Sequence, residues 1–261
     1  MKKTLVFVLV LTLVYLAFFC SVSYAGQDAR VIYVKGDVKI NRIRAGITMA
    51  VKEGDKIITA KGSYIEIGFD ESLKNNVKID QNSFAVIKKI TPQQIDINLL
   101  NGKIFSLLEN VGENETFRII TPVAVVGVRG TGLSSKTNQK ESEFVAFEDK
   151  IFVRGITDDG GLMNEVIVRQ GWKAGVKRFG SPGKQNKISK KEKRQWRKWK
   201  RLLNKHVKDF PGKEAGDYSG KEKKFQKIIE RTDSNVEKSD MEKIEKRTEQ
   251  EQNGGREIIA H

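Results

Sequence analysis

Histidine and cysteine are almost absent from this chain of 261 residues. The single cysteine, Cys20, excludes a disulfide within the chain. The two histidines, His206 and His261, both lie near the C-terminal end, so residues 26–180 contain neither histidine nor cysteine. That region cannot build a histidine-based catalytic triad, a thiolate nucleophile or a zinc site of nitrogen and sulfur ligands. We predict that the protein is not an enzyme and uses no cofactor and no metal.

Long apolar runs are also missing, except at the N-terminus. Residues 1–25 begin with Lys2 and Lys3, continue with an apolar run at 5–19 and end in a small-x-small sequence at Ala25, which is the layout of a secretory signal. The run is shorter than the roughly 20 residues that a membrane span needs. We predict cleavage after Ala25 and export to the periplasm or cell envelope. An uncleaved anchor and a lipoprotein attached at Cys20 are the alternatives.

Positive charge is concentrated in one segment. The chain has 48 Lys and Arg against 33 Asp and Glu, but residues 181–208 alone hold 12 basic residues and one acid, Glu192. Residues 26–180 are only slightly basic, and residues 209–261 are slightly acidic. The high isoelectric point therefore belongs to a short segment and does not indicate a basic fold.

Residues 26–180 consist of short apolar stretches separated by turn residues. In 64–69, Ile65 and Ile67 fall on one face and Glu66 on the other, the period of a half-buried strand. Asn101-Gly102 predicts a tight turn between a strand at 95–99 and a return strand at 103–107. Besides 64–69, the other expected strands are 31–34, 38–40, 56–59, 77–80, 84–87, 117–120, 123–128, 144–147, 151–153 and 166–168. We predict an all-β domain, and the turn spacing fits a β-solenoid or a β-sandwich.

A helical period replaces this alternation at Ser189. Ser189 and Glu192 form a capping-box pattern, in which each side chain satisfies a backbone N–H group at the start of a helix. Apolar side chains then recur on one face, with basic side chains opposite. These apolar residues are Trp196, Trp199, Leu202, Leu203, Val207 and Phe210. We predict a linker at 181–188, a basic amphipathic helix at 189–210 and a charged, largely disordered tail at 211–261.

Five segments in a fixed order connect the β region to a known family. They are GDKIITAKGSYIEIGF, VKIDQNSFAVI, INLLNGKIFSLL, FRIITPVAVVGVRGTG and ESEFVAFEDKIFV. Over about residues 31–176 the chain resembles the FecR-type periplasmic domain. The resemblance implies a non-catalytic all-β domain, β-solenoid in form and exported to the cell envelope.

The best-known members sense an outer-membrane transporter and relay its state to a sigma factor through a cytoplasmic segment. Here the N-terminus has the pattern of a signal only, so we predict a binding or scaffolding module. A signalling regulator that lacks the sigma-factor segment is an alternative.

Arg129, Gly130 and Thr131 match the sharpest part of the family motif. The functional interpretation is a partner-contacting turn, with Arg129 as a forked donor to a carboxylate or phosphate. The structural interpretation is that glycines permit tight corners and Arg129 pairs with a nearby carboxylate. The residues concerned in that interpretation are Gly127, Gly130, Gly132, Glu141, Glu143 and Glu148.

The basic helix is the second candidate site. Its candidate surface residues are Lys193, Trp196, Arg197, Trp199, Lys200, Arg201 and Lys205. One interpretation docks the apolar stripe on the β domain and leaves the cations in water. A second adsorbs the helix to an anionic membrane surface, with the tryptophans at the interface. A third binds an acidic envelope protein or a polyanionic glycan. Nucleic acid is not an expected partner because the protein is predicted to be exported.

Acidic residues of the β region offer weaker candidates. Asp158-Asp159-Gly160-Gly161 has oxygen ligands that suit calcium, but the pattern is equally that of an ordinary loop. Two carboxylate pairs, Glu141 with Glu143 and Glu148 with Asp149, could serve in acid–base catalysis, but strand and turn positions explain them more simply.

Overall fold

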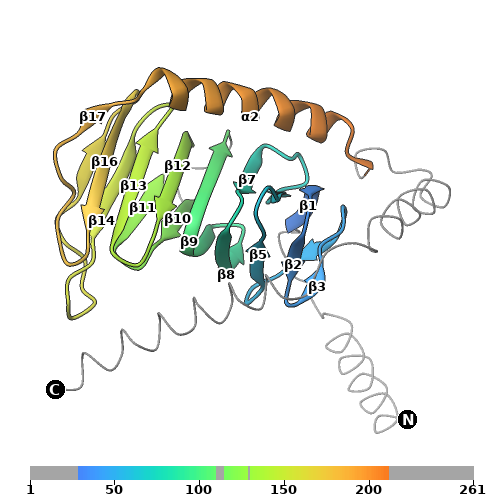
Figure 1. Cartoon of the computed structure of the whole chain (residues 1–261), viewed down its shortest axis with the longest axis horizontal. Coiled ribbons are helices and arrows are strands. Elements are labelled where there is room, and N and C mark those ends of the chain that lie inside the picture. The colour runs from blue at the N-terminus through green and yellow to red at the C-terminus, as the bar shows by residue number, and fades with distance from the viewer. Residues whose placement is uncertain (1–28, 110–114, 129, 212–261) are drawn as a thin grey trace, which may run out of the picture.

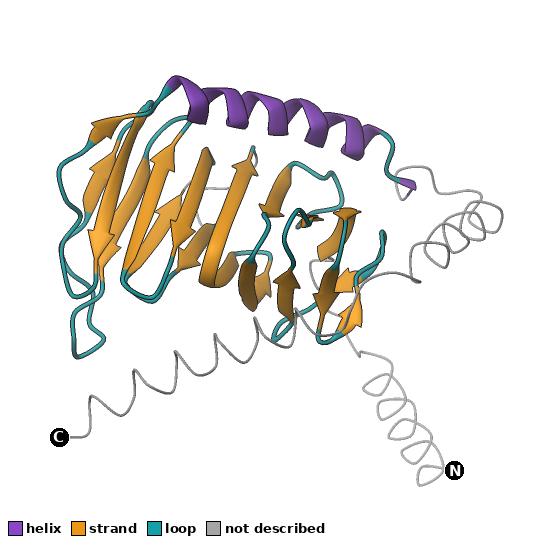
Figure 2. Cartoon of the chain, in the orientation of Figure 1, coloured by secondary structure: helices purple, strands orange, loops and turns teal. Residues whose placement is uncertain are grey.

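The computed structural model describes residues 29–109, 115–128 and 130–211. The predicted signal and tail lie outside these residues. Within them the chain is built of strands and a single α-helix, α2 (Lys190–Lys208), which crosses the strands along one side of the molecule (Figures 1 and 2). The all-β class of residues 29–180 is therefore confirmed, and α2 occupies the segment in which the sequence predicts a basic helix.

The strands pair into two sheets. Sheet A carries α2 on its outer face. Its strands, in order of pairing, are β4 (Ala50–Val51), β1 (Ala29–Lys35), β6 (Tyr64–Gly68), β7 (Asn75–Ile79), the second half of β9 (Gln94–Leu108), β12 (Gly132–Thr137), β13 (Glu141–Ala146), β16 (Trp172–Lys177) and β17 (Asn186–Lys187).

Sheet B lies on the other side of the core. In order of pairing it contains β3 (Ile43–Arg44), β2 (Val38–Ile40), β5 (Lys56–Thr59), β8 (Ser83–Thr91), the first half of β9, β10 (Thr116–Ile120), β11 (Ala124–Val128), β14 (Ile151–Gly155) and β15 (Val166–Val168). The two sheets remain open. Only β9 and β10 pair in parallel among the described strands, so the expected β-solenoid is not confirmed.

The main core fills the space between the two sheets. Alternation along each strand sends one set of side chains inward, such as Ile65 and Ile67 of β6 and Ile97 and Leu99 of β9, all fully buried. A second apolar cluster lies on the opposite, outer face of sheet A, under α2. Sheet A is therefore covered on both faces in this region, which explains why β6 and β7 are buried almost throughout.

Strand β9 joins the two sheets, and here the structure corrects the sequence. The predicted tight turn at Asn101-Gly102 does not form, and 95–99 does not pair with 103–107. Instead β9 is continuous. Its first half pairs with β8 and β10, and its second half pairs with β7 and β12. Gly102, with a φ of +99°, allows the strand to bend from one sheet into the other.

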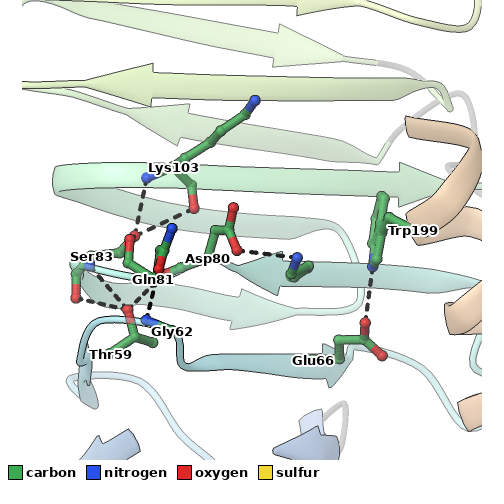
Figure 3. Close-up of polar contacts among 9 residues, drawn as sticks. Thr59, Gly62, Glu66, Asp80, Gln81, Ser83, Lys103 and Trp199 are labelled. Atoms are coloured by element: carbon green, nitrogen blue, oxygen red, sulfur yellow. Dashed lines mark hydrogen bonds and ion pairs between the residues drawn. The ribbon is translucent and has the colours of Figure 1, made fainter. Parts of the chain in front are cut away.

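Ser83 of β8 holds this bend in place (Figure 3). Its hydroxyl oxygen accepts a hydrogen bond from the backbone N–H of Lys103 at 3.0 Å, and its own backbone N–H donates to the hydroxyl of Thr59 at 2.9 Å. A Cβ atom at Gly102 would lie 2.2 Å from the Ser83 hydroxyl and 2.6 Å from its Cα. The bend therefore requires glycine for two reasons, its backbone angle and its lack of a side chain.

Five strands are absent from the sequence prediction: β3, β4, β12, β16 and β17. Strand β12, Gly-Leu-Ser-Ser-Lys-Thr, is almost wholly buried but contains a single large apolar residue. Its small hydroxyl side chains do not produce the apolar alternation on which a strand prediction depends. Tertiary packing, and not local pattern, makes this segment a strand.

Replacing Gly102 with alanine tests the bend. Gly54 is the matched control because it also has a positive φ, +86°, but nothing lies within 4 Å of its would-be Cβ. We expect Gly54→Ala to lower the free energy of unfolding by about 1–2 kcal/mol through backbone strain alone. Gly102→Ala should cost about 1–3 kcal/mol more because of the clash with Ser83. Urea denaturation of the full chain measures both, and equal losses would contradict the account.

Candidate functional site

Helix α2 begins at a complete capping box that also reaches sheet A. The Ser189 hydroxyl accepts from the Glu192 N–H at 3.2 Å, and the Glu192 carboxylate accepts from the Ser189 N–H at 2.6 Å. Lys173 of β16 places its ammonium 2.9 Å from Glu192 and 2.9 Å from Glu143. Burial raises the pKa of Glu192, but the hydrogen bonds from Ser189 and Lys173 outweigh it and leave that pKa below its usual value. The bond to Glu192 raises the pKa of Lys173 in turn.

The apolar stripe of α2 packs onto the outer face of sheet A. Trp196 and Trp199 are only 5% and 3% exposed. The Trp196 ring stacks on Phe147 with ring centroids 4.7 Å apart. The ring centroids of Trp199 and Phe105 are 5.5 Å apart. Burying a tryptophan contributes on the order of 4 kcal/mol, so these two side chains dominate the attachment of the helix.

Gly132 makes the close approach of Trp196 possible. A Cβ at this glycine would lie 2.3 Å from Cζ2 of Trp196 and 3.1 Å from Cγ of Glu148. Gly132 is the last residue of the motif FRIITPVAVVGVRGTG. The C-terminal end of the motif therefore forms part of the surface on which α2 packs.

A fully buried carboxylate lies under the middle of the helix. Glu66 of β6 is 0% exposed. One of its oxygens accepts from the indole N–H of Trp199 at 3.0 Å (Figure 3), and the other lies 2.6 Å from Nδ1 of His206. The His206 ring stacks on Tyr33 with centroids 3.7 Å apart. A buried charge is tolerated only when it is well paired and hydrogen-bonded, and α2 supplies both partners of Glu66.

Glu148 provides a second polar contact between the helix and the β region. It accepts from the indole N–H of Trp196 at 3.1 Å and from the ammonium of Lys200 at 2.7 Å. Both charged side chains are partly exposed, so this ion pair contributes less than about 1 kcal/mol. Its main effect is to fix the register of α2 on the sheet.

The outward face of α2 is a row of cations, which we call the cationic face. None of its members has an acidic side chain within ion-pair distance in the described part of the chain, and all are exposed. The residues are Lys190, Lys191, Lys193, Arg194, Arg197, Lys198, Arg201, Lys205 and Lys208. Several are four residues apart, such as Lys193, Arg197 and Arg201, a spacing at which like charges repel.

The structure separates the predicted helix residues into three groups. Lys193, Arg197, Arg201 and Lys205 lie on the cationic face. Lys200 is half-buried and paired with Glu148. Trp196 and Trp199 are inside the interface with sheet A, and not at an outer surface where lipid could reach them. This arrangement is the one in which the apolar stripe docks on the β domain.

Of the three predicted motif residues, the structure describes Gly130 and Thr131. Arg129 lies outside the described residues. Gly130 has a φ of +65°, which explains a glycine there. Thr131 is 4% exposed, and its hydroxyl has no hydrogen-bond partner among the described residues. Gly127 has neither a positive φ nor a close neighbour, so the expected role in a tight corner applies to Gly130 and not to Gly127.

Sequence reasoning missed the polar contacts beneath the helix. Glu66 was expected on the outward face of its strand, and it is there, but α2 covers that face. His206 follows Trp199 by seven residues and Leu203 by three, a spacing that places it on the apolar side of the helix. That spacing is the one signal in the sequence that could have indicated a buried histidine.

The acidic loop at 158–161 is held by its own hydrogen bonds. The Asp159 carboxylate accepts from the Thr157 hydroxyl and from the Gly161 N–H, and these bonds lower the pKa of Asp159. Across 29–109, 115–128 and 130–211, no three His, Cys, Asp or Glu side chains are grouped as a metal site. No helix in the same residues is long and apolar enough to span a bilayer.

Comparison with known proteins gives a family match for part of the β region. The model of the FecR protein family matches residues 55–152, from β5 into β14. The resemblance seen in the sequence is therefore confirmed over this segment. No curated protein matches the chain.

Solved structures give a more distant likeness. Two crystal structures of a candidate anti-sigma factor from Parabacteroides distasonis ATCC 8503 are 14% identical to this chain, with a TM-score of 0.44. The match covers 54% of this chain and 63% of that protein, so the chain spans less than two thirds of its length.

Substitution of Gly132 tests whether the motif supports the helix. Gly132→Ala should displace Trp196 and lower the free energy of unfolding by about 1–3 kcal/mol, with a change in tryptophan fluorescence. Gly127→Ala is the matched control, since nothing lies within 4 Å of its would-be Cβ. Urea denaturation followed by fluorescence reports both effects. An unchanged spectrum and midpoint for Gly132→Ala would show that Trp196 does not pack on this glycine.

Proposed function

We propose that the protein is an exported, non-enzymatic binding module, in which the cationic face of α2 holds an acidic partner of the cell envelope, protein or glycan. The observation that carries this proposal is the unpaired state of that face. Its exposed cations have no carboxylate opposite them among the described residues, although the same helix places Lys200 on Glu148 and Glu192 on Lys173.

The cationic face lowers the stability of the helix. Each like-charge pair at a spacing of four residues costs about 0.2–0.5 kcal/mol. An isolated helix of 19 residues with this composition would be marginal in water. Docking on sheet A offsets that cost and holds the cations in a fixed row facing away from the β region. An acidic partner would relieve the repulsion between these cations. The repulsion is therefore an argument that the row serves to bind such a partner.

The attachment of α2 favours a polyanion over insertion into lipid. A helix that adsorbs to a membrane buries its apolar face among the acyl chains. Here Trp196, Trp199 and Leu203 already occupy the interface with sheet A, together with Phe105 and Phe147. The cations can still reach an anionic surface, but the apolar stripe cannot do so without leaving the sheet.

The family relationship supports the non-enzymatic part of the proposal. The FecR resemblance implies a periplasmic regulator without catalytic groups, and residues 29–109, 115–128 and 130–180 hold neither histidine nor cysteine. Export rests on the signal pattern at 1–25. A relay to a sigma factor stays a prediction from the resemblance.

Charge reversal tests the proposal better than deletion of the helix. Removing 189–210 would uncover Phe105, Leu107 and Phe147 and destabilise the β region. The exposed positions Lys193, Arg197 and Arg201 can be changed without touching the interface. A matched control reverses three exposed lysines elsewhere, Lys61, Lys88 and Lys89, with the same change in net charge.

We expect the full chain to bind poly-L-glutamate, with an affinity that falls as salt is raised. An exposed ion pair contributes about 0.2–1 kcal/mol, so reversing Lys193, Arg197 and Arg201 to glutamate should weaken binding by about tenfold or more. The control triple variant should change it by less than about threefold.

Equal losses in the two variants would show that net charge alone attracts the polymer. Absence of binding by the unaltered chain would refute the proposal. Binding to vesicles of anionic lipid but not to poly-L-glutamate would favour the membrane adaptor instead.

A further inference from the structure

A cleft of about 570 Å³ opens on sheet A beside the N-terminal end of α2, where Lys173 and Glu143 are among its lining residues. Strands β12, β13 and β16 and the segment 180–186 form its walls. Three lining residues are glycines, Gly175, Gly180 and Gly183, and their missing side chains leave the hollow. The N–H of Gly183 donates to the carbonyl of Gly175 at 2.8 Å, which fixes the segment over the strand. The volume lies in the range of sites for small molecules.

The cleft has an excess of positive charge. Lys136, Lys173, Lys177 and Lys184 line it, against Glu141 and Glu143. Lys173 already pairs with Glu143 and Glu192. Lys136, Lys177 and Lys184 have no carboxylate within ion-pair distance in the described part of the chain, so Glu141 is the one acid left to balance three ammonium groups.

One of these lysines stands in an unfavourable position. Lys136 of β12 is directly opposite Lys103 of β9, where like charges are destabilising, and its neighbour on the other side is Glu143 of β13, which already pairs with Lys173. Burial lowers the pKa of Lys103, the charges of Asp80, Glu143 and Glu192 oppose this, and the charge of Lys136 makes a smaller lowering contribution. An anion bound beside Lys136 would relieve this repulsion.

The remaining lining groups indicate a hydrophilic ligand. Asn138, Asn186 and Ser181 supply amide and hydroxyl groups, and Val176 is the sole large apolar side chain among the lining residues. The hydroxyls of Thr137 and Ser142 are 2.7 Å apart and satisfy each other deeper in the wall. The exposed lining as a whole is more apolar than polar, so the cleft suits a ligand that carries both polar groups and apolar faces, as a sugar does.

Phe179 lies in the chain between the lining residues Lys177 and Gly180 but does not itself line the cleft. It is 47% exposed and has a φ of +56°, a conformation that costs a bulky residue about 1–3 kcal/mol. The guanidinium of Arg178 lies over this ring, 4.9 Å from its centroid, so only the part of the ring that Arg178 leaves uncovered can pack against the apolar face of a sugar.

We infer that this cleft binds an acidic sugar, with its carboxylate among Lys136, Lys177 and Lys184 and its hydroxyl groups against the amides of Asn138 and Asn186. The site is distinct from the cationic face of α2 and does not depend on the function proposed for that face. It takes a short saccharide, whereas the cationic face suits an extended acidic partner.

Two variants of the full chain test the cleft, each with a matched control. Gly175→Val fills the hollow without a backbone clash, because its Cβ would lie 3.9 Å from the nearest atom, the Ser142 carbonyl oxygen. Its control is Gly127→Val, in β11 of sheet B. Lys136→Gln with Lys177→Gln removes the charge, and Lys61→Gln with Lys88→Gln is its control. Circular dichroism verifies that each variant folds.

Isothermal titration with trigalacturonate gives the readout. We expect the unaltered chain and both controls to bind it, and both cleft variants to lose about tenfold or more in affinity, the effect of one or two lost charge-assisted contacts. The α-1,4-linked galactotriose, the neutral counterpart, should bind much more weakly. The Lys193, Arg197 and Arg201 reversal should leave trigalacturonate binding unchanged, which separates this site from α2.

Three results would overturn the inference. The unaltered chain could fail to bind trigalacturonate, or the Gly175→Val variant could bind it normally. Sulfate could also abolish the binding of trigalacturonate in a competition titration at the same concentration of anion charge. That result would show that the cleft is a simple anion site.

Discussion

The contact between the carboxylate of Glu66 and helix α2 is the constraint on which the rest of the structure depends. A carboxylate that is withdrawn from water costs several kcal/mol unless both oxygens are satisfied. Trp199 and His206 satisfy them from 133 and 140 positions away in the chain. The outer face of sheet A is therefore complete only when α2 lies on it, and α2 is part of the folded unit, although it lies beyond the segment 55–152 that matches the FecR family.

This attachment determines what the helix can present to a partner. With its two tryptophans buried, the helix turns mostly basic side chains outward, and the capping box and Glu148 fix its direction and register. The family motif contributes to the same arrangement, because Gly132 leaves the space that Trp196 fills. The sheet and the helix together produce two positively charged features on one side of the molecule, the cationic face and the cleft beside β16.

Local pattern predicted the all-β class, most strands and the presence of a helix after Ser189, because alternation and helical period are properties of neighbouring residues. It failed where contacts between segments far apart in the sequence determine which strands pair and which side chains are buried. Asn101-Gly102 has the composition of a hairpin turn, but the second half of β9 pairs with β7 and β12 instead of folding back on the first half. Strand β12 has too few large apolar residues to be recognised. Glu66 looked solvent-exposed, since nothing in 64–69 shows that a helix more than 120 residues later covers it. The cleft arises from three separated glycines and was invisible for the same reason.

Hydrogen exchange of the full chain, read by mass spectrometry, tests most directly whether α2 is an integral part of the fold. The amides of residues 196–208 should be protected to a degree comparable with those of β9, because the helix opens only when its buried stripe leaves sheet A. Exchange of these amides at the rate of an unstructured peptide, with β9 still protected, would contradict the account.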